Sequence, residues 1–277
     1  SDLKTNLVSW YDLGSVELGT SLITGDSSDM DTVGSWTADN WSSGVSIAVT
    51  SVSGGQEGNA LQVDSGSGRG FARYNSTTGL TVVNGRSYRV SVWGKNGEGE
   101  GTVALAYTYG HTHYVNDASA TSADGKVNTY DIQSQDTDLH IALVQSSSGN
   151  SVLWDNVTVK PINVADSHGS NTGSVYGATT TTGYTSSPHG VVDPLNFGEV
   201  YSGRALDFDG SNDYVSVPDD NSLSFGDGSN DSAFSISAWV KMDDATSFTI
   251  ASKGIYNSTA EWKLGVGSDD KLILIIY

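Results

Sequence analysis

The stretch YRVSVWG at residues 88–94 indicates the fold class, because its side chains alternate between two chemical kinds. Tyr88, Val90 and Val92 fall on one face of an extended strand, whereas an arginine, a serine and a tryptophan fall on the other. Similar runs rich in Val, Ile, Thr and Tyr recur along the chain, separated by Gly, Asn, Asp and Ser. Good helix formers are scarce, and no stretch keeps the apolar period of a helix. The sequence therefore predicts an all-β fold made of antiparallel β-sandwiches.

The expected strands fall into two series, separated by a connection rich in Gly, Ser and Thr at 177–190. The first series suits a two-sheet sandwich or jelly roll. The second ends in KLILIIY (271–277), which is apolar on both faces and is therefore typical of a central strand with a neighbour on each side. Either the sequence continues beyond this strand, or another copy of the chain supplies the missing neighbour. We expect the first series at 45–52, 59–63, 71–75, 88–94, 102–115, 139–145 and 152–159, the second at 205–209, 213–217, 234–240, 248–254, 261–267 and 271–277, and a separate strand at 6–14.

The composition of the chain limits the kinds of partner that it can have. The formal net charge is −19, from 13 basic and 32 acidic residues, and this argues against nucleic acid because phosphate contacts need clustered Lys and Arg. Such an acidic surface stays soluble at high salt, as in a marine setting. The chain has no cysteine, so disulfides and thiolate metal sites are excluded. No apolar run approaches membrane-spanning length, and we expect no membrane insertion.

Two families share motifs with this sequence. SGRALDFDGSNDYVSVPD (202–219) followed by FSISAWVK (234–241) resembles the laminin-G/concanavalin-A-like sandwich, in the form common in bacterial and phage surface proteins. LVSWY (7–11) is similar to the opening strand of those domains, and DSHGSNTGSVYGAT (166–179) to the segment that follows it. The match is complete only if residues of about 18–163 are an insertion.

The insertion itself resembles the jelly-roll carbohydrate-binding modules. The resemblances imply an opening strand at 1–17, a jelly roll at 18–163 and a laminin-G-like sandwich at 164–277 that is incomplete at its C-terminus. The segment DNVTVK (155–160) is similar to the ends of repeats in virion proteins of marine bacteriophages, which implies a virion-surface or extracellular location. The jelly-roll resemblance rests on LITGDSSDMDTVGSWT (22–37), GGQEGNALQV (54–63), GRSYRVSVWGK (85–95) and VLWDNVTVKPI (152–162).

The strand expected at 102–115 holds the candidate glycan-binding row. Counting by two places Tyr107, Tyr109, His111 and His113 on one face. A pyranose has an apolar C–H face and a rim of hydroxyls, and such a row offers flat rings with polar edges. The alternative is that the tyrosines face the core and the histidines lie at a frayed, solvated end. The spacing of the two histidines also suits metal ligands, but a zinc site needs further ligands, and we expect none here.

Trp36 and Trp41 lie in WTADNWSSG (36–44), a region that we expect to be rich in loops. In the resembled modules this region borders the ligand face, so the resemblance implies that these tryptophans stack on a sugar. The alternative is that a tryptophan here covers the edge of the sandwich.

Asp155 lies on what we expect to be the core face of its strand, VLWDNVTV (152–159). A carboxylate there needs a cation or several hydrogen bonds, because its burial alone costs too much free energy. The resembled modules often carry a structural calcium ion, held by an acid in this strand and by oxygens near the first strand. The resemblance therefore implies a Ca²⁺ site of Asp155 with Asp26, Asp29 and Asp31, the oxygen ligands that calcium takes.

No catalytic motif is found in the sequence. It has neither the E-x-D-x-x-E strand of glycosidases on concanavalin-like folds nor a G-x-S-x-G elbow. We therefore predict a non-catalytic bacteriophage surface, fibre or decoration protein that binds glycans on host or environmental surfaces. As partners we expect glycans, other virion proteins and further copies of the chain. The alternatives are the carbohydrate-binding modules of a secreted bacterial polysaccharide-degrading enzyme or adhesin, and a purely architectural virion protein.

Overall fold

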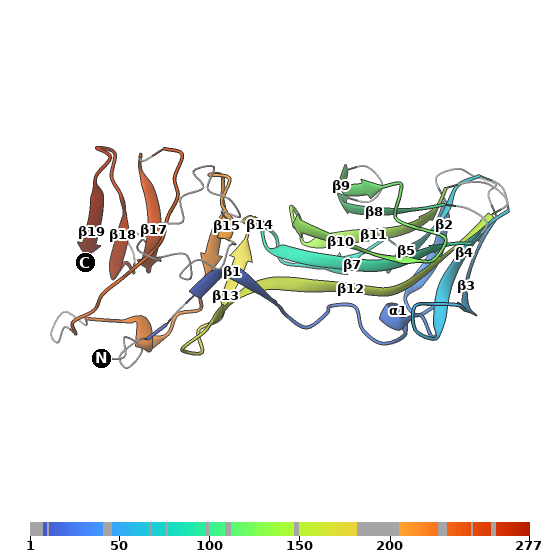
Figure 1. Ribbon diagram of the computed structural model, residues 1–277, viewed down its shortest axis with the longest axis horizontal. Coiled ribbons are helices and arrows are strands. Elements are labelled where there is room, and N and C mark those ends of the chain that lie inside the picture. The colour runs from blue at the N-terminus through green and yellow to red at the C-terminus, as the bar shows by residue number, and fades with distance from the viewer. Residues whose placement is uncertain are drawn as a thin grey trace, which may run out of the picture. The chain divides into compact units, whose positions relative to one another are not determined.

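The computed structural model describes residues 8–9, 11–40, 46–66, 68–75, 77–97, 100–108, 112–146, 150–181, 205–226, 232–244, 246–255 and 259–277. The chain forms two units, a larger one of Tyr11–Val217 and a smaller one of Ser1–Trp10 with Pro218–Tyr277. Both contain antiparallel strands (Figure 1), and the helices among the described residues are α1 (Asp26–Asp29) and a 3-10 turn at Asn221–Leu223. Neither of these helices is long and apolar enough to cross a membrane. The all-β prediction is confirmed.

Two antiparallel sheets form a sandwich in the larger unit (Figure 1). In the eight-stranded sheet, β1, β3 and β4 join the path β10-β7-β12-β13-β16, and in the six-stranded sheet β6 joins the path β2-β5-β11-β8-β9. A small third sheet pairs β14 with β15. The strands are β1 (Tyr11–Leu18), β2 (Trp36–Asn40), β3 (Ile47–Ser53), β4 (Asn59–Ser65), β5 (Gly70–Tyr74), β6 (Leu80–Thr81), β7 (Ser87–Asn96), β8 (Gly101–Thr108), β9 (Thr112–Asp117), β10 (Lys126–Gln133), β11 (Asp138–Gln145), β12 (Asn150–Asp166), β13 (Gly173–Tyr176), β14 (Thr179–Thr181), β15 (Ala205–Asp207) and β16 (Tyr214–Ser216).

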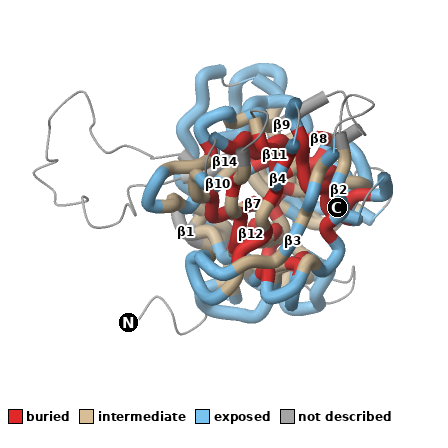
Figure 2. The backbone as a smooth tube through the Cα atoms, turned by 90° about the vertical axis from the view of Figure 1, so that its right-hand side faces the viewer, coloured by how far each residue is buried: buried red, intermediate tan, exposed pale blue. Residues whose placement is uncertain are grey.

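The main core of the larger unit lies between the two sheets and agrees with the alternation from which the strands were predicted. Val90 and Val92 of β7 are fully buried, and so are Ile141 and Leu143 of β11 in the other sheet. Burial of each such side chain contributes about 1.5–3 kcal/mol. Figure 2 shows this buried centre in red along β7, β11 and β12.

A second, smaller core surrounds the C-terminal half of β12, a strand of 17 residues. Ile162 and Val164 of β12 are buried together with Val175 of β13 and Leu206 of β15. β12 pairs with β4 and β7 along its first half, and with β1 and β13 near its end. One long strand therefore contributes to both cores of the larger unit. The predicted domain boundaries stay a prediction.

Two predicted strands are wrong. The segment 102–115, predicted as one strand, is the antiparallel hairpin of β8 and β9. No strand is found at 234–240 among the described residues, and Phe234 there stacks on Phe225 with ring centroids 4.5 Å apart. Both segments show apolar alternation, but alternation alone does not show where a strand reverses or whether it has a partner.

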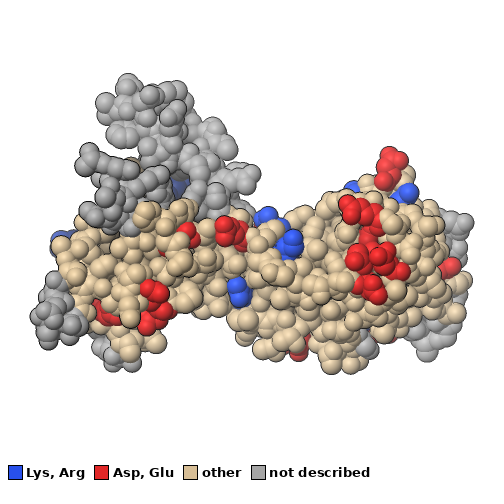
Figure 3. Space-filling model, turned by 90° about the horizontal axis from the view of Figure 1, so that it is seen from below, with Lys and Arg blue, Asp and Glu red and all other residues tan. Residues whose placement is uncertain are grey.

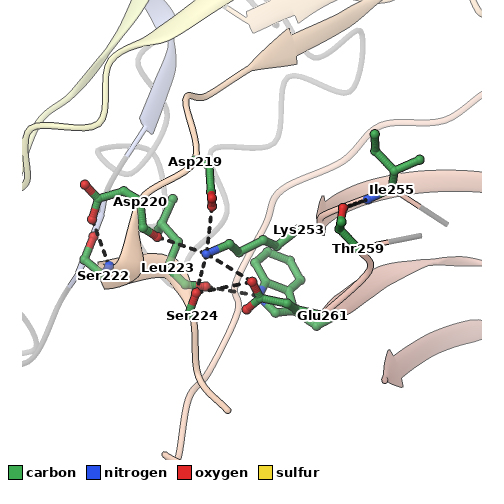
Figure 4. A network of polar contacts seen from close by, with 10 residues as sticks. Asp219, Asp220, Ser222, Leu223, Ser224, Lys253, Ile255, Thr259 and Glu261 are labelled. Atoms are coloured by element: carbon green, nitrogen blue, oxygen red, sulfur yellow. Dashed lines mark hydrogen bonds and ion pairs between the residues drawn. The ribbon is translucent and has the colours of Figure 1, made fainter. Parts of the chain in front are cut away.

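The smaller unit contains a three-stranded sheet of β17 (Phe248–Lys253), β18 (Trp262–Val266) and β19 (Leu272–Ile276), in that order. A network of polar contacts centres on Lys253, whose side chain is mostly buried (Figure 4). Its Nζ lies 3.1 Å from Asp219 Oδ1 and 3.3 Å from Glu261 Oε1. The first ion pair joins the segment before the sheet to β17, and the second joins β17 to the residue before β18.

β19 carries the apolar sequence for which a central position was predicted. In the described residues it pairs with β18 alone. Its side chains Leu272, Leu274 and Ile276 are exposed. The central position is therefore not found in this part of the chain.

Candidate functional site

Alternate residues of the six-stranded sheet point away from the main core and form an outward face. Leu139, Ile141 and Leu143 of β11 belong to the core, so His140 and the residues in step with it lie on the opposite side. In register with them, Arg73 of β5 pairs with Ala142, and Phe71 pairs with Val144. Beside β11, the outward positions of β8 are alanines: Ala104 is in register with Ala142 and Ala106 with His140. We call this set of outward residues, together with Asp39 of β2, the outward face.

Arg73 is the central cation of the outward face. Its Nε lies 3.2 Å from Asp39 Oδ2, and its guanidinium carbon lies 5.0 Å from the centroid of the Phe71 ring. The Arg73 side chain is 6% exposed, whereas that of Asp39 is 29% exposed. A carboxylate and a ring face together fix a guanidinium in one orientation. The cation is therefore held in place by neighbours on two strands, β2 and β5.

His140 is the second polar group of the outward face, and its side chain is almost completely buried. Burial lowers its pKa, and the positive charge of Arg73 lowers it further, while Asp138 and Asp136 act in the opposite direction. The imidazole is therefore neutral at pH 7, with one N–H donor and one acceptor nitrogen. Ala106 pairs with both His140 and His113, so these two histidine positions fall in one row of the sheet, two strands apart.

The residues predicted to bind glycan are only partly described. Tyr109, His111 and Trp41 lie outside the described residues. Tyr107 belongs to β8 and His113 to β9, which places their backbones but not their side chains. Tyr107 and His113 lie on two different strands of the β8–β9 hairpin, which contradicts the prediction that they share one strand.

Trp36 is a core residue, so the predicted contact with a sugar is wrong for it. Its side chain is 2% exposed, and its Nε1 donates a hydrogen bond to the Ser27 carbonyl oxygen at 2.9 Å. The indole meets the Tyr74 ring edge to face, with centroids 5.4 Å apart. A ring enclosed in this way has no face left for stacking on a ligand.

The register also shows how far the end of β2 lies from the end of β8 along the six-stranded sheet. Asn40, the residue before Trp41, pairs with Gly70, and through β11 this level of the sheet continues to Gly101 at the start of β8. Tyr107 lies six residues further along β8, which is about 20 Å along the strand. The end of β2 and the β8–β9 hairpin therefore lie at opposite ends of the sheet.

Asp155 is completely buried and has several hydrogen bonds, but it does not lie on the core face of β12, as was predicted. The core residues in this part of the strand are Val152 and Trp154, so the Asp155 side chain points to the other face. Its Oδ2 accepts from the backbone N–H groups of Gln56 at 2.8 Å and Glu57 at 3.2 Å, and its Oδ1 accepts from that of Asn156 at 2.7 Å. Asn156 has a φ of 49° at an irregularity of β12, which shifts the register between this point and Thr158. This β-bulge re-aims the carboxylate toward the β3–β4 loop.

The environment of Asp155 acts on its pKa in both directions. Burial raises the pKa, and the negative charge of Asp29 adds to this effect. The three backbone N–H donors lower it, but by less, so that the pKa lies above that of an ordinary aspartate. The carboxylate is therefore one whose charge is partly, but not fully, compensated by the fold.

The predicted calcium ligands are not assembled around Asp155. Asp26, Asp29 and Asp31 are exposed, and Figure 3 shows acidic side chains gathered on the surface around α1. No group of three or more Asp, Glu, His or Cys side chains suited to a metal ion occurs in the described part of the chain. The groups that surround the Asp155 carboxylate are N–H donors, which repel a cation. In this arrangement the four carboxylates do not fit a calcium ion.

Sequence reasoning missed Arg73 and His140. Both belong to strands that were predicted, FARYN (71–75) and LHIALVQ (139–145), where each is a polar residue in step with small or apolar neighbours on the non-core face. That signal identifies the face. It does not identify the neighbours, because the order of strands in the sheet is needed to bring β5 next to β11.

No family model and no curated protein matches this chain. Among solved structures, the chain is similar to "Family 16 Carbohydrate Binding Module-2" at 14% identity, over 48% of this chain and 95% of that one, with a TM-score of 0.34. The xylan-binding CBM22-1 domain from Paenibacillus barcinonensis Xyn10C is similar at 16% identity, over 55% and 96%, with a TM-score of 0.33. Tailspike protein 4 of bacteriophage CBA120 is similar at 12% identity, over 51% of this chain and 21% of the tailspike chain, with a TM-score of 0.37. These are distant similarities of fold to jelly-roll carbohydrate-binding modules and to one part of a tailspike.

Proposed function

We propose that the protein binds glycans without a catalytic activity of its own, through the outward face of the six-stranded sheet. The observation that carries the proposal is the grouping of Arg73, Asp39 and His140 on this face. The β8–β9 hairpin, with the predicted contact residues Tyr107 and His113, continues the sheet beside them. Tyr109, His111 and Trp41 lie outside the described residues. Substitution of each by alanine, followed by a glycan-array assay, tests the rest of the prediction.

The three polar side chains suit the hydroxyl groups of a sugar. The Arg73 guanidinium carries donors in a fixed fork, the Asp39 carboxylate carries acceptors, and the neutral His140 carries one of each. Arg73 and His140 are buried, so the Asp39 side chain, which is 29% exposed, is the most accessible of the three to a ligand. A sugar hydroxyl both donates and accepts, so it can bridge such a set. Ala104 and Ala106 lie beside these residues and are buried themselves.

The place of this binding in biology is a further part of the proposal. The DNVTVK segment at 155–160 and the laminin-G-like motifs favour the surface of a bacteriophage virion, in contact with other virion proteins and further copies of the chain. A module of a secreted polysaccharide-degrading enzyme or adhesin, or a purely architectural role, are the rival functions. The sequences that adjoin this chain in its native protein distinguish the virion-surface function from the enzyme module, since an enzyme module adjoins a catalytic domain. An architectural protein binds no glycan.

A glycan array of bacterial and marine polysaccharides tests the binding itself, with Asp39→Asn as the diagnostic variant. Asp131→Asn is the matched control, because Asp131 also pairs with an arginine, at 2.7 Å from Arg89 Nη2, but in the other sheet. We expect Asp39→Asn to weaken binding about tenfold, or about 1.4 kcal/mol, and Asp131→Asn to leave it unchanged. A wild-type protein that binds nothing on the array, or equal binding by both variants, contradicts the proposal.

A further inference from the structure

Two tyrosines form a stacked pair at the β13–β16 end of the eight-stranded sheet. Tyr176 and Tyr214 pair in register across the strands, and their rings lie parallel within 7° with centroids 4.6 Å apart. Val175 and Val215 pack on the second core, so the tyrosines lie on the opposite, outward side of the sheet. Tyr214 is 51% exposed. The pair therefore presents an aromatic surface to solvent.

A row of polar side chains lies beside this aromatic surface. Asn163 of β12 pairs with Ser174 of β13, which pairs with Ser216 of β16, so the three side chains share the outward side with the tyrosines. The row is two residues from the tyrosine pair along the strands, which is about 7 Å. The Asn163 amide oxygen accepts a hydrogen bond from Arg86 Nη2 at 2.8 Å, which fixes the orientation of the amide.

The stacking of the pair does not by itself account for the exposure of Tyr214. A cross-strand aromatic pair stabilises the pairing of β13 with β16, and for this each ring needs only one of its faces. The Gly85 backbone lies near Tyr176, which is half-buried, whereas Tyr214 keeps about half of its surface open. Tyr176 thereby covers one face of the Tyr214 ring and fixes the orientation of that ring.

We propose that Tyr214 is the platform of a second saccharide-binding site. The apolar C–H face of a neutral pyranose rests on the face of the Tyr214 ring that is turned away from Tyr176. Of the polar row, Ser216 on the same strand lies nearest to its hydroxyls. This site is built on the eight-stranded sheet, so it needs none of the residues of the outward face around Arg73. Two sites on one chain raise the avidity for a long glycan through effective concentration.

Isothermal titration with xylohexaose, cellohexaose and mannohexaose tests this site on the full chain. The variants are Tyr214→Leu, which removes the ring but keeps an apolar side chain, and Tyr214→Phe, which keeps the ring. Tyr277→Ala is the matched control, because Tyr277 is a comparably exposed tyrosine, at 54%, in the smaller unit. We expect Tyr214→Leu to weaken binding of at least one hexaose about tenfold, while Tyr214→Phe and Tyr277→Ala stay within about twofold of the wild type.

Two results overturn the inference: wild-type protein that binds none of the three hexaoses, and Tyr214→Leu protein that binds as the wild type does. Asp39→Asn, measured in parallel, separates this site from the proposed one. If Tyr214→Leu loses affinity and Asp39→Asn does not, the Tyr214 site stands and the function proposed for the outward face fails. If only Asp39→Asn loses affinity, the reverse holds. Thermal unfolding of each variant verifies that the fold is kept.

Discussion

Replacement of Asp155 by alanine tests how the buried carboxylate of the larger unit is satisfied. The substitution removes the acceptor of three backbone N–H groups, those of Gln56, Glu57 and Asn156. Each buried donor left without a partner costs about 1–3 kcal/mol. Gln56 and Glu57 are exposed, so water replaces part of the loss, and the free energy spent on burying the carboxylate is recovered. The net destabilisation expected is about 2 kcal/mol.

For a unit of this size, 2 kcal/mol lowers the melting temperature by about 4–8 °C. The assay is differential scanning calorimetry of wild type, Asp155→Ala and the control Asp131→Ala. The control breaks a partly exposed ion pair with Arg89 and is expected to cost less than about 1 kcal/mol. Each protein is scanned with EDTA and with added Ca²⁺. We expect neither addition to change the wild-type melting temperature, because N–H donors occupy the carboxylate. Either of two results would refute this reasoning. One is an Asp155→Ala protein with the melting temperature of the wild type. The other is a wild-type melting temperature that EDTA lowers and Ca²⁺ restores.

Three further predictions concern packing, ion pairing and pH. Gly125→Ala is expected to cost about 2 kcal/mol more free energy of unfolding than Gly210→Ala in chemical denaturation. Both glycines have positive φ, but only a Cβ at position 125 would clash with the Trp93 ring. Equal costs would contradict this packing. Lys253→Met is expected to destabilise the smaller unit by about 1–2 kcal/mol, because it leaves the partly buried Glu261 carboxylate without its cation. Hydrogen exchange in β17 and β18 measures this, and unchanged protection would count against it. The raised pKa of Asp155 means that the folded state takes up this proton at a higher pH than the unfolded state. The group therefore adds stability as pH falls through its folded pKa. The melting temperature of the wild type should rise relative to that of Asp155→Asn between pH 7 and about 4 in thermal scans. A difference in melting temperature that stays constant with pH would exclude the shift.

The fold could be predicted from the sequence wherever one face of a strand is apolar and the other polar. YRVSVWG (88–94) is such a case, and β7 follows it. β10 (Lys126–Gln133) was missed, because its buried positions include Asn128, which the structure satisfies with hydrogen bonds to Val92 O and Ala120 O. A polar residue that is buried through such bonds breaks the alternation by which strands are recognised.

The candidate site could be predicted less well than the fold. The burial of Asp155 was predicted, but its face was not, because Leu153 and Asp155 lie on the side opposite to the core. The β-bulge after Asp155 then brings Val157 to the core face. Trp36 was assigned to a loop, whereas it belongs to β2 and to the main core. Arg73 and His140 lie 67 residues apart in the chain, and only the strand order brings them to one face. Single-residue patterns carry no information on that order.

An NMR titration tests the central claim most directly, that the outward face of the six-stranded sheet binds glycan. Labelled protein is titrated with the polysaccharide fragment that binds best on the array, and the methyl signals of Ala104, Ala106 and Ala142 are followed with the ring signals of His140. The account predicts that these signals shift in a saturable manner, while the methyl signals of Val90 in the main core do not. A bound glycan that leaves the His140 and alanine signals in place would contradict it.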